Sequence, residues 1–272
     1  DSPLPEALEM ILLFESEMEK HADLIRPVRS YADIEQNQAD GVMSALLTGE
    51  EGEITMGNPD FLYFLYKLGM RMMTLTWNYE NSLGFPNVRL DKKSSASSDR
   101  YCLSQNKGLK EQGIVFLEEM ERLGMIIDVS HLSDAGFYDV LEHTTKPFVA
   151  SHSNARSVCP AVRNLTDDMV RRLAERGGIT GINFCKEFLG KPDVSQNYLD
   201  QAVVHMKYLM NLGGEDFVAL GSDFDGITRY HDLSDCSVMP KLVHTMKKAG
   251  LTPTQIEKIC YKNTLRVYRE LL

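Results

Sequence analysis

The sequence predicts an α/β protein, a (β/α)8 barrel of the TIM type that lacks its first two β/α units in the 272 residues given. Strand-like and helix-like segments alternate, the strands are apolar at nearly every position, and the chain opens on a helix-like stretch (PLPEALEMILLFESEMEKHADLI) with no strand before it. Continuous apolar strands are typical of parallel sheets covered on both faces. A six-stranded doubly wound sheet is the alternative, but it usually carries a glycine-rich phosphate loop, and neither GxGxxG nor GxxxxGK[ST] occurs here.

Six strand-like runs set the expected order of elements. They are residues 42–48, 71–77, 125–131, 147–151, 178–184 and 217–223. Amphipathic helices lie between them. Asn58, Thr166 and Thr252 are expected N-caps, the first and last of them followed by proline at the first helical position. Gly69 and Gly177 are expected to end helices, because the residue after a helix C-terminus often adopts the left-handed conformation that glycine favours.

Length, charge and cysteine content exclude several classes of protein. A hydrophobic content of 43% over 272 residues fits one domain spanning residues 1–272. The net charge is −10, and no cluster of basic and aromatic residues is visible, which argues against a nucleic-acid partner. The apolar runs fall far short of the ~18 residues that a membrane segment needs. Five widely spaced cysteines without a CxxC pair favour a reducing, cytoplasmic compartment.

Side chains able to bind metal or move protons follow the predicted strands, and in a barrel these strand ends converge on one face. In chain order they are Glu50 with Glu51, Asn78, His131, His152, Asn183 and Asp223. Two imidazoles and a carboxylate on separate strands are the ligands of a catalytic zinc site, so Glu50, His131 and His152 are the predicted metal ligands. Of the neighbours Glu50 and Glu51, only one can face the pocket.

Other polar residues near the strand ends have less definite roles. Asp223 continues its strand and is the candidate general acid or base, whereas Asp225 is expected to stabilise a turn. Asp128 points away by strand alternation and is expected to make a structural hydrogen bond. Arg163 is either a fork for a substrate carboxylate or a partner in a loop salt bridge.

Asn78 and Asn183 are candidate hydrogen-bonding residues for the substrate. The remaining histidines are interpreted as structural or solvated: His21, His143, His205, His231 and His244. The Asn-Leu-Thr sequon at Asn164 is expected to be unused, given the cysteine pattern.

The stretches around these residues resemble the membrane (renal) dipeptidase family of zinc peptidases, within the amidohydrolase superfamily, and specifically its soluble bacterial members. The matching stretches are LGMRMMTLTWNYEN, GMIIDVSHLSDAGFYDVLE, KPFVASHSNARSVCP, RNLTDDMV, GGITGINF and GSDFDGI, over roughly residues 40–230. The resemblance implies a (β/α)8 barrel, a bacterial source, and hydrolysis of a dipeptide by a hydroxide held between two zinc ions.

The resemblance also implies a role for each candidate residue. Glu50 corresponds to the carboxylate that bridges both metals, and His131 and His152 correspond to the imidazoles on the second metal. Arg163 matches the arginine that binds the free C-terminal carboxylate, and Asp223 matches the aspartate that carries the proton from water to the leaving amine. A small dipeptide is thus the expected partner. Since family members are often dimers, a homodimer is an assembly that the resemblance allows.

The sequence departs from the family pattern at three places. The first strand of the family ends in a His-x-Asp pair that binds the first metal, and no such pair ends a strand before Glu50. The His-Ala-Asp at residues 21–23 lies in a helix-like stretch and is interpreted as a chance match. We therefore expect the chain to hold at most one zinc. Trp77 replaces the histidine that stabilises the oxyanion in vertebrate members, and Phe188 replaces a tyrosine near the substrate.

Two other hypotheses stay open at this stage. One is another amidohydrolase reaction, on acylated amino acids or lactams. The other is a catalytically silent relative that binds peptides.

Overall fold

The computed structural model describes residues 2–87, 107–193, 197–228 and 232–272, and the chain divides into two compact units. The described residues up to Lys146, together with residues 268–272, form the first unit. The described residues between 147 and 267 form the second unit. Both units are α/β, and all ladders between the named strands given below are parallel. The predicted α/β class with a mainly parallel sheet is confirmed, whereas barrel closure and a single domain stay predictions.

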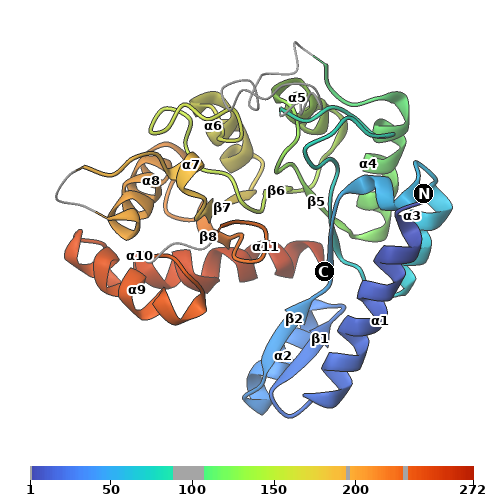
Figure 1. The fold of residues 1–272 in the computed structure, drawn as a ribbon, viewed down its shortest axis with the longest axis horizontal. Helices are drawn as coiled ribbons and strands as arrows, with labels where there is room; N and C mark the ends of the chain where they lie inside the picture. The colour runs from blue at the N-terminus through green and yellow to red at the C-terminus, as the bar shows by residue number, and fades with distance from the viewer. Residues whose placement is uncertain (1, 88–106, 194–196, 229–231) are drawn as a thin grey trace. The chain divides into compact units, whose positions relative to one another are not determined.

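The first unit carries five helices and five strands among its described residues. The helices are α1 (Leu4–Lys20), α2 (Tyr31–Asp40), α3 (Pro59–Lys67), α4 (Glu111–Leu123) and α5 (Asp134–His143), with a 3-10 turn η1 (Gly52–Thr55). The strands are β1 (Ile25–Val28), β2 (Met43–Leu46), β3 (Thr48–Glu50), β4 (Met72–Thr74) and β5 (Ile126–Asp128). Strands β1 and β2 form a two-stranded sheet packed against α1 and α2 (Figure 1). Strands β3, β4 and β5 follow one another in a second sheet.

Strand β1 is absent from the prediction, which continued the opening helix through residues 21–28. The helix ends at Lys20, with His21 as its C-cap. Pro27 excludes a helix interior, and it also disfavours helical backbone at the residue before it. The strand shows no apolar run because Val28 is its only buried residue. The expectation that no strand precedes residues 42–48 is therefore wrong.

The predicted strand over residues 42–48 is two strands with different partners. Strand β2 pairs with β1, while β3 pairs with β4 through Thr48 opposite Met72 and Glu50 opposite Thr74. The apolar pattern runs through both, so the sequence gives no sign of the break. As a result Glu50 is the last residue of a strand and not the second residue of the following loop.

The second unit continues the alternation. Its strands are β6 (Val149–Ala150), β7 (Ile179–Asn183) and β8 (Val218–Ser222), in that order in the sheet. Its helices are α6 (Asp167–Glu175), α7 (Lys186–Leu189), α8 (Tyr198–Gly213), α9 (Met239–Lys248), α10 (Pro253–Glu257) and α11 (Asn263–Leu271), with a 3-10 turn η3 (Cys236–Val238) and a π-helical turn η4 (Lys258–Lys262). The last residues of α11 count with the first unit.

The predicted helix ends are confirmed by their hydrogen bonds. The side chains of Asn58, Thr166 and Thr252 each accept from a backbone N–H two or three residues later, at 2.9 to 3.2 Å. Gly69 and Gly177 have φ of +107° and +78°, which a residue with a side chain adopts only under strain. The elements that carry the strand-end residues thus begin and end where local chemistry favours it.

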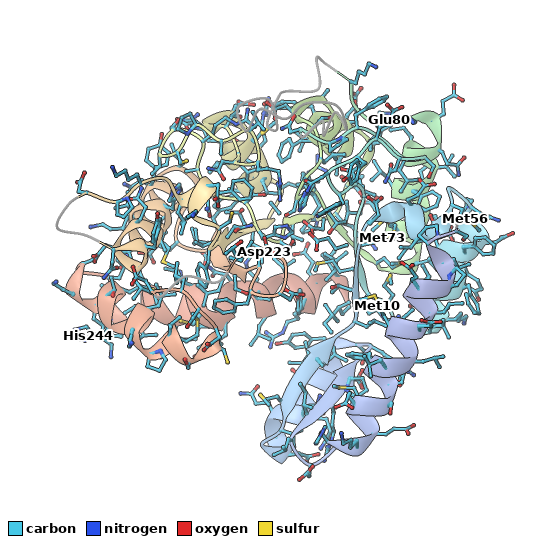
Figure 2. The ribbon with its side chains drawn as sticks, viewed as in Figure 1. Met10, Met56, Met73, Glu80, Asp223 and His244 are labelled. Carbon is cyan, nitrogen blue, oxygen red and sulfur yellow. The ribbon has the colours of Figure 1, made fainter. Side chains whose placement is uncertain are left out.

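Each unit has its own apolar core. Met73 of β4 (labelled in Figure 2) is fully buried with Leu62 and Leu65 of α3, and Phe148, Phe184 and Phe217 are buried beside the strands of the second unit. Cys159, Cys185, Cys236 and Cys260 are free, and Cys102 and His231 lie outside the described residues. Among the described residues, no helix is both long enough and apolar enough to cross a membrane.

His205 of α8 is a fully buried polar residue that ties three parts of the second unit together. Its Nδ1 accepts from the backbone N–H of Ala155 at 3.2 Å, and its Nε2 donates to the carbonyl of Leu189 in α7 at 2.9 Å. Burial lowers the pKa of His205 to about 4, because the charged imidazolium cannot be solvated there. His205 is therefore neutral and structural, as predicted.

We expect acid to destabilise the protein through His205. The unfolded state takes up a proton below about pH 6.5, while the folded imidazole stays neutral until about pH 4, so stability falls as pH drops through that interval by up to about 3 kcal/mol. Urea unfolding between pH 7 and 4 measures this loss. His205→Gln should flatten that pH dependence, whereas His244→Gln, at an exposed position of α9, should leave it as in the unchanged protein.

Candidate metal centre

Glu50 and His131 lie against each other in the first unit. The Nε2 atom of His131 is 3.0 Å from Oε1 of Glu50, and the imidazole is 8% exposed while the carboxylate is 45% exposed. His131 comes three residues after β5 ends and has a φ of +69°, a left-handed backbone that turns the chain away from the strand direction. The strand end and this turn together bring the imidazole to the end of β3.

The other ring nitrogen of His131 is held by Asn78. Its Nδ1 lies 3.0 Å from the carboxamide oxygen of Asn78, which only accepts, so the proton is on Nδ1. The lone pair of Nε2 then faces the carboxylate of Glu50. Two acceptors at that distance require a positive charge between them, either a further proton or a cation. A histidine that donates its second N–H to an oxygen is the usual arrangement of a metal ligand.

Glu51 points into its own loop and not to this pair. Its carboxylate accepts from the backbone N–H groups of Glu53 and Trp77 and from the side chain of Asn81, at 2.5 to 3.1 Å. These bonds fix the loop after β3 and the turn after β4. Only Glu50 of the two neighbours is thus directed toward His131, in line with the expectation that one of them does so.

Asp128 has the structural role that the sequence indicated. It is buried, accepts from the hydroxyl of Thr74 at 2.7 Å and from the N–H of Ser130 at 3.0 Å, and lies in register with Glu50 through Thr74. Burial, with the charge of Asp128 adding to it, raises the pKa of Tyr268 to about 12. Asp128 therefore fixes the end of β5 from which the chain turns to His131.

His152 follows β6 in the second unit. It is 8% exposed, and its Nδ1 lies 2.7 Å from the hydroxyl of Ser151. Close packing of glycines holds its main chain: a Cβ on Gly221 would overlap the carbonyl oxygen of Ser151 and come within 2.9 Å of the His152 Cα. A Cβ on Gly181 of β7 would likewise overlap the Ser151 carbonyl oxygen. Only glycine at these positions lets the strands of this unit lie as they do.

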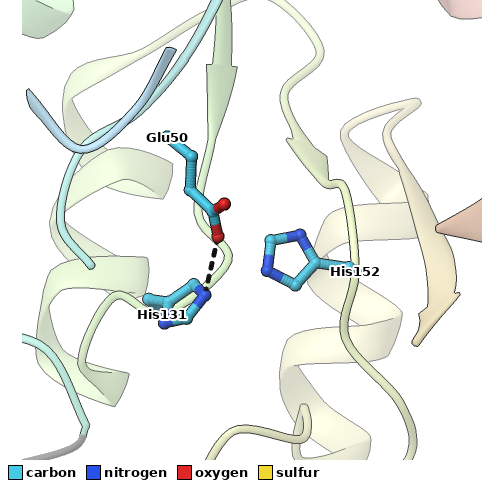
Figure 3. Close-up of side chains that lie close together, drawn as sticks. All are labelled: Glu50, His131 and His152. Carbon is cyan, nitrogen blue, oxygen red and sulfur yellow. Dashed lines mark ion pairs between the residues drawn. The ribbon is translucent and has the colours of Figure 1, made fainter. Parts of the chain in front are cut away.

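Glu50, His131 and His152 form a candidate metal centre. One ligand atom of each lies within 4.8 Å of the others, and Figure 3 shows the three side chains turned toward one another. Two imidazoles and one carboxylate suit zinc, which takes nitrogen and oxygen ligands and keeps a further position for water or substrate in catalytic sites. The donor set of these three side chains fits a metal ion, and their role as its ligands stays a prediction.

Asp223 lies just beyond β8, where Figure 2 labels it, and is held by Asn183 at the end of β7. The carboxamide nitrogen of Asn183 donates to Oδ2 of Asp223 at 2.9 Å. Asp225 is exposed, in a turn where the N–H of Gly226 donates to the carbonyl of Asp223. The acid predicted for proton transfer and the acid predicted for a turn thus occupy different environments.

Arg163 is 5% exposed, in the loop between β6 and α6. Its guanidinium lies over the ring of Phe188, with 5.5 Å from Cζ to the ring centroid. The next residue, Asn164, is buried and donates to the carbonyls of Cys159 and Phe188 at 2.9 and 2.8 Å. This loop is therefore fixed from inside, and the Asn164 sequon is closed to a glycan in the folded protein.

The sequence analysis missed the hydrogen bonds by which asparagine side chains hold other residues of the candidate site. Asn78 and Asn183 were assigned to the substrate, whereas their carboxamides contact His131 and Asp223. Asn154 was not singled out at all, although it exchanges two hydrogen bonds of 2.9 Å with the backbone of Asn183. The available signal was its place two residues after His152, in the stretch SHSN.

The outlying histidines have local partners. His21 lies 3.4 Å from Glu17 in α1, and His143 is bonded to the carbonyl of Asp139 in α5. These contacts agree with a structural or solvated role.

A comparison with protein families gives a match over residues 2–271 to the model described as membrane dipeptidase, peptidase family M19. The chain belongs to the membrane dipeptidase family. The resemblance carried by the sequence stretches is confirmed, and with it a hydrolase of the metallopeptidase type.

Proteins of bacteria and fungi are similar to this chain. An uncharacterized Klebsiella pneumoniae protein, encoded in a pqqA 5′ region, is 36% identical over 253 residues, 92% of this chain and 90% of its own length. An uncharacterized dipeptidase of Schizosaccharomyces pombe is 36% identical over 75% of this chain, and a dipeptidase of Claviceps purpurea 31% over 98%. The match spans 47% and 60% of these two fungal proteins.

Solved structures agree with this placement. A metallopeptidase of Rhodobacter sphaeroides, liganded with a phosphinate mimic of the dipeptide L-Ala-D-Ala, matches with a TM-score of 0.85 at 29% identity, over 99% of this chain and 75% of that one. A family M19 metallopeptidase called dipeptidase AC matches with a TM-score of 0.86 at 30% identity, over 98% and 77%.

We expect Gly221→Ala to weaken metal binding by displacing His152. The added methyl overlaps the Ser151 carbonyl, and relieving such an overlap costs about 1–3 kcal/mol and moves the backbone. Isothermal titration with zinc measures the affinity, and thermal unfolding measures stability. Gly214→Ala is the matched control: its φ is +86° with open space around the Cβ, so it should lose stability and keep metal affinity. Equal zinc affinity in both variants would contradict this account of His152.

Proposed function

We propose that this chain is a zinc-dependent dipeptidase, which hydrolyses dipeptides that carry a free C-terminal carboxylate. The observation that carries the proposal is the 3.0 Å approach of Nε2 of His131 to the carboxylate of Glu50, with the carboxamide oxygen of Asn78 at the other ring nitrogen. Together with His152 they would hold the metal. Zinc, when bound, supplies a Lewis acid that polarises the substrate carbonyl and lowers the pKa of water.

Arg163 supports the choice of a substrate with a free carboxylate. The planar fork of a guanidinium suits a carboxylate, which accepts two parallel hydrogen bonds from it. Stacking over Phe188 fixes the plane of the guanidinium, so an incoming carboxylate meets donors in a set orientation.

Asp223 supports general acid and base catalysis. We assign it the proton that a water molecule loses when its oxygen bonds to the carbonyl carbon. The same proton then passes to the amide nitrogen as the C–N bond breaks, which gives a free amine and a free carboxylic acid. The bound phosphinate mimic of L-Ala-D-Ala in the Rhodobacter sphaeroides relative makes that dipeptide a suitable first substrate to test.

We expect the purified protein, stripped by a chelator and reloaded, to bind zinc and to cleave L-Ala-D-Ala or another short dipeptide. His152→Ala should lower zinc affinity by more than the ~10–100-fold that losing an outer hydrogen bond of a ligand costs. His244→Ala, at an exposed position of α9, should bind as the unchanged protein does. A protein that binds no zinc and leaves dipeptides intact, with His131→Ala behaving the same, overturns the proposal in favour of a silent peptide-binding relative.

We expect Arg163→Met to lower kcat/KM for a dipeptide by about 10- to 100-fold, since a hydrogen bond to a charged group contributes about 1.5–3 kcal/mol. The C-terminal amide of the same dipeptide should be a poor substrate for the unchanged protein and should lose little more in the variant. Rates on the paired substrates measure this. Equal rates on acid and amide would favour the alternative amidohydrolase reaction on acylated amino acids or lactams.

A further inference from the structure

Asn183 has every polar group of its side chain engaged inside the second unit. It is 0% exposed. Its carboxamide nitrogen donates to Oδ2 of Asp223 at 2.9 Å and to the carbonyl of His152 at 3.4 Å, and its oxygen accepts from the N–H of Cys185 at 2.7 Å. Both amide hydrogens have acceptors, so this side chain offers none to a bound substrate.

The position of Asn183 is itself fixed. The carboxamide of Asn154 accepts from the backbone N–H of Asn183 and donates to its carbonyl, each at 2.9 Å. Asn154 is 0% exposed, and its own backbone N–H donates to the side-chain oxygen of Asn164 at 3.3 Å. A buried amide bonded on both edges has one arrangement, because any rotation leaves polar atoms unsatisfied. Asn183 therefore presents its N–H to Asp223 from a rigid base.

Asp223 is the more exposed partner in this contact. It is partly exposed, and Ser222 and Asp223 have φ of +41° and +71°, so the chain leaves β8 through two consecutive left-handed residues. Such residues cost about 1–2 kcal/mol each and persist only when contacts hold them. On the far side of the carboxylate, a Cβ on Gly226 would overlap Oδ1, so Oδ1 lies close over the glycine backbone. Asn183 holds one oxygen and the bare Gly226 leaves room for the other.

We propose that Asn183 is a positioning residue, which holds Oδ2 of Asp223 so that the carboxylate is oriented for proton transfer through Oδ1. The inference rests on the proposed dipeptidase function and deepens it. Proton transfer requires the two heavy atoms within about 2.6–3.2 Å. A carboxylate free to rotate satisfies that only part of the time, so kcat falls while the substrate, bound elsewhere, keeps its KM.

The test compares Asn183→Leu with Asn183→Asp in the full chain loaded with zinc. Asn183→Asp keeps the shape and an oxygen that accepts from Cys185, and it replaces the donor to Asp223 and to the carbonyl of His152 with an acceptor oxygen that repels the Asp223 carboxylate. Positioning through Asp223 predicts that kcat falls about 10–100-fold in both variants, with KM within about threefold. A purely structural role predicts that Asn183→Asp is much milder than Asn183→Leu, and that result would overturn the inference.

A double-substitution cycle separates action through Asp223 from loss of the fold. In an Asp223→Asn background, Asn183→Leu should lower kcat by less than about twofold further, because the group it acts on is already gone. A full further loss of kcat would contradict the inference. Asn263→Leu is the matched control: it removes a buried carboxamide that donates to the carbonyls of Glu215 and Val218, so it should lower Tm and keep kcat.

A crystallographic arm keeps this inference distinguishable from the proposed function. If the unchanged protein cleaves no dipeptide, the dipeptidase proposal fails, and the contact between Asn183 and Asp223 is then judged from structures alone. Positioning predicts one conformation of the Asp223 carboxylate in the unchanged protein and a rotated or divided one in Asn183→Leu. An Asp223 carboxylate that is unmoved in Asn183→Leu would overturn the inference without any assay of activity.

Discussion

The contact of Glu50 with His131 is the interaction on which the functional site depends. An imidazole that gives its Nδ1 proton to Asn78 turns a lone pair toward a carboxylate 3.0 Å away, and two acceptors repel each other unless a positive charge stands between them. A proton on Nε2 or a bound cation supplies that charge, and an ion pair with a half-exposed carboxylate adds little stability by itself. Binding of a cation would add the free energy that the ion pair lacks, and we therefore propose that the pair is functional.

Much of the site could be predicted because its logic is local. His131 and His152 follow short buried strands, and the sequence shows each histidine directly after an apolar strand-like run. The break between β2 and β3 was not visible, since an apolar residue looks the same whichever strand it pairs with. Strand β1 escaped because Val28 alone is buried and tertiary pairing with β2 supplies what the apolar pattern lacks.

The roles of the buried asparagines could not be predicted for a different reason. An asparagine at a strand end has the same letter whether it donates to a substrate or to a neighbouring side chain, and the choice depends on backbone angles that the sequence does not display. At Asn183 the choice follows from the left-handed residues Ser222 and Asp223, which bring the carboxylate to the carboxamide. Asn154 and Asn164 are fixed in turn by carbonyls and N–H groups that only the folded loop presents.

The use of neutral amides around Asp223, where a lysine or arginine would also donate, fits a residue that must both take and give a proton. A cation against the carboxylate would favour its charged form strongly and make it a weak base. A carboxamide holds the oxygen with a hydrogen bond of 2.9 Å and adds no net charge, so orientation is set without a cation beside the carboxylate. The same reasoning applies to His131, whose outer nitrogen meets the neutral Asn78. A carboxylate there would add negative charge beside Glu50. In both cases a neutral carboxamide orients the side chain of Asp223 or His131 and adds no net charge beside it.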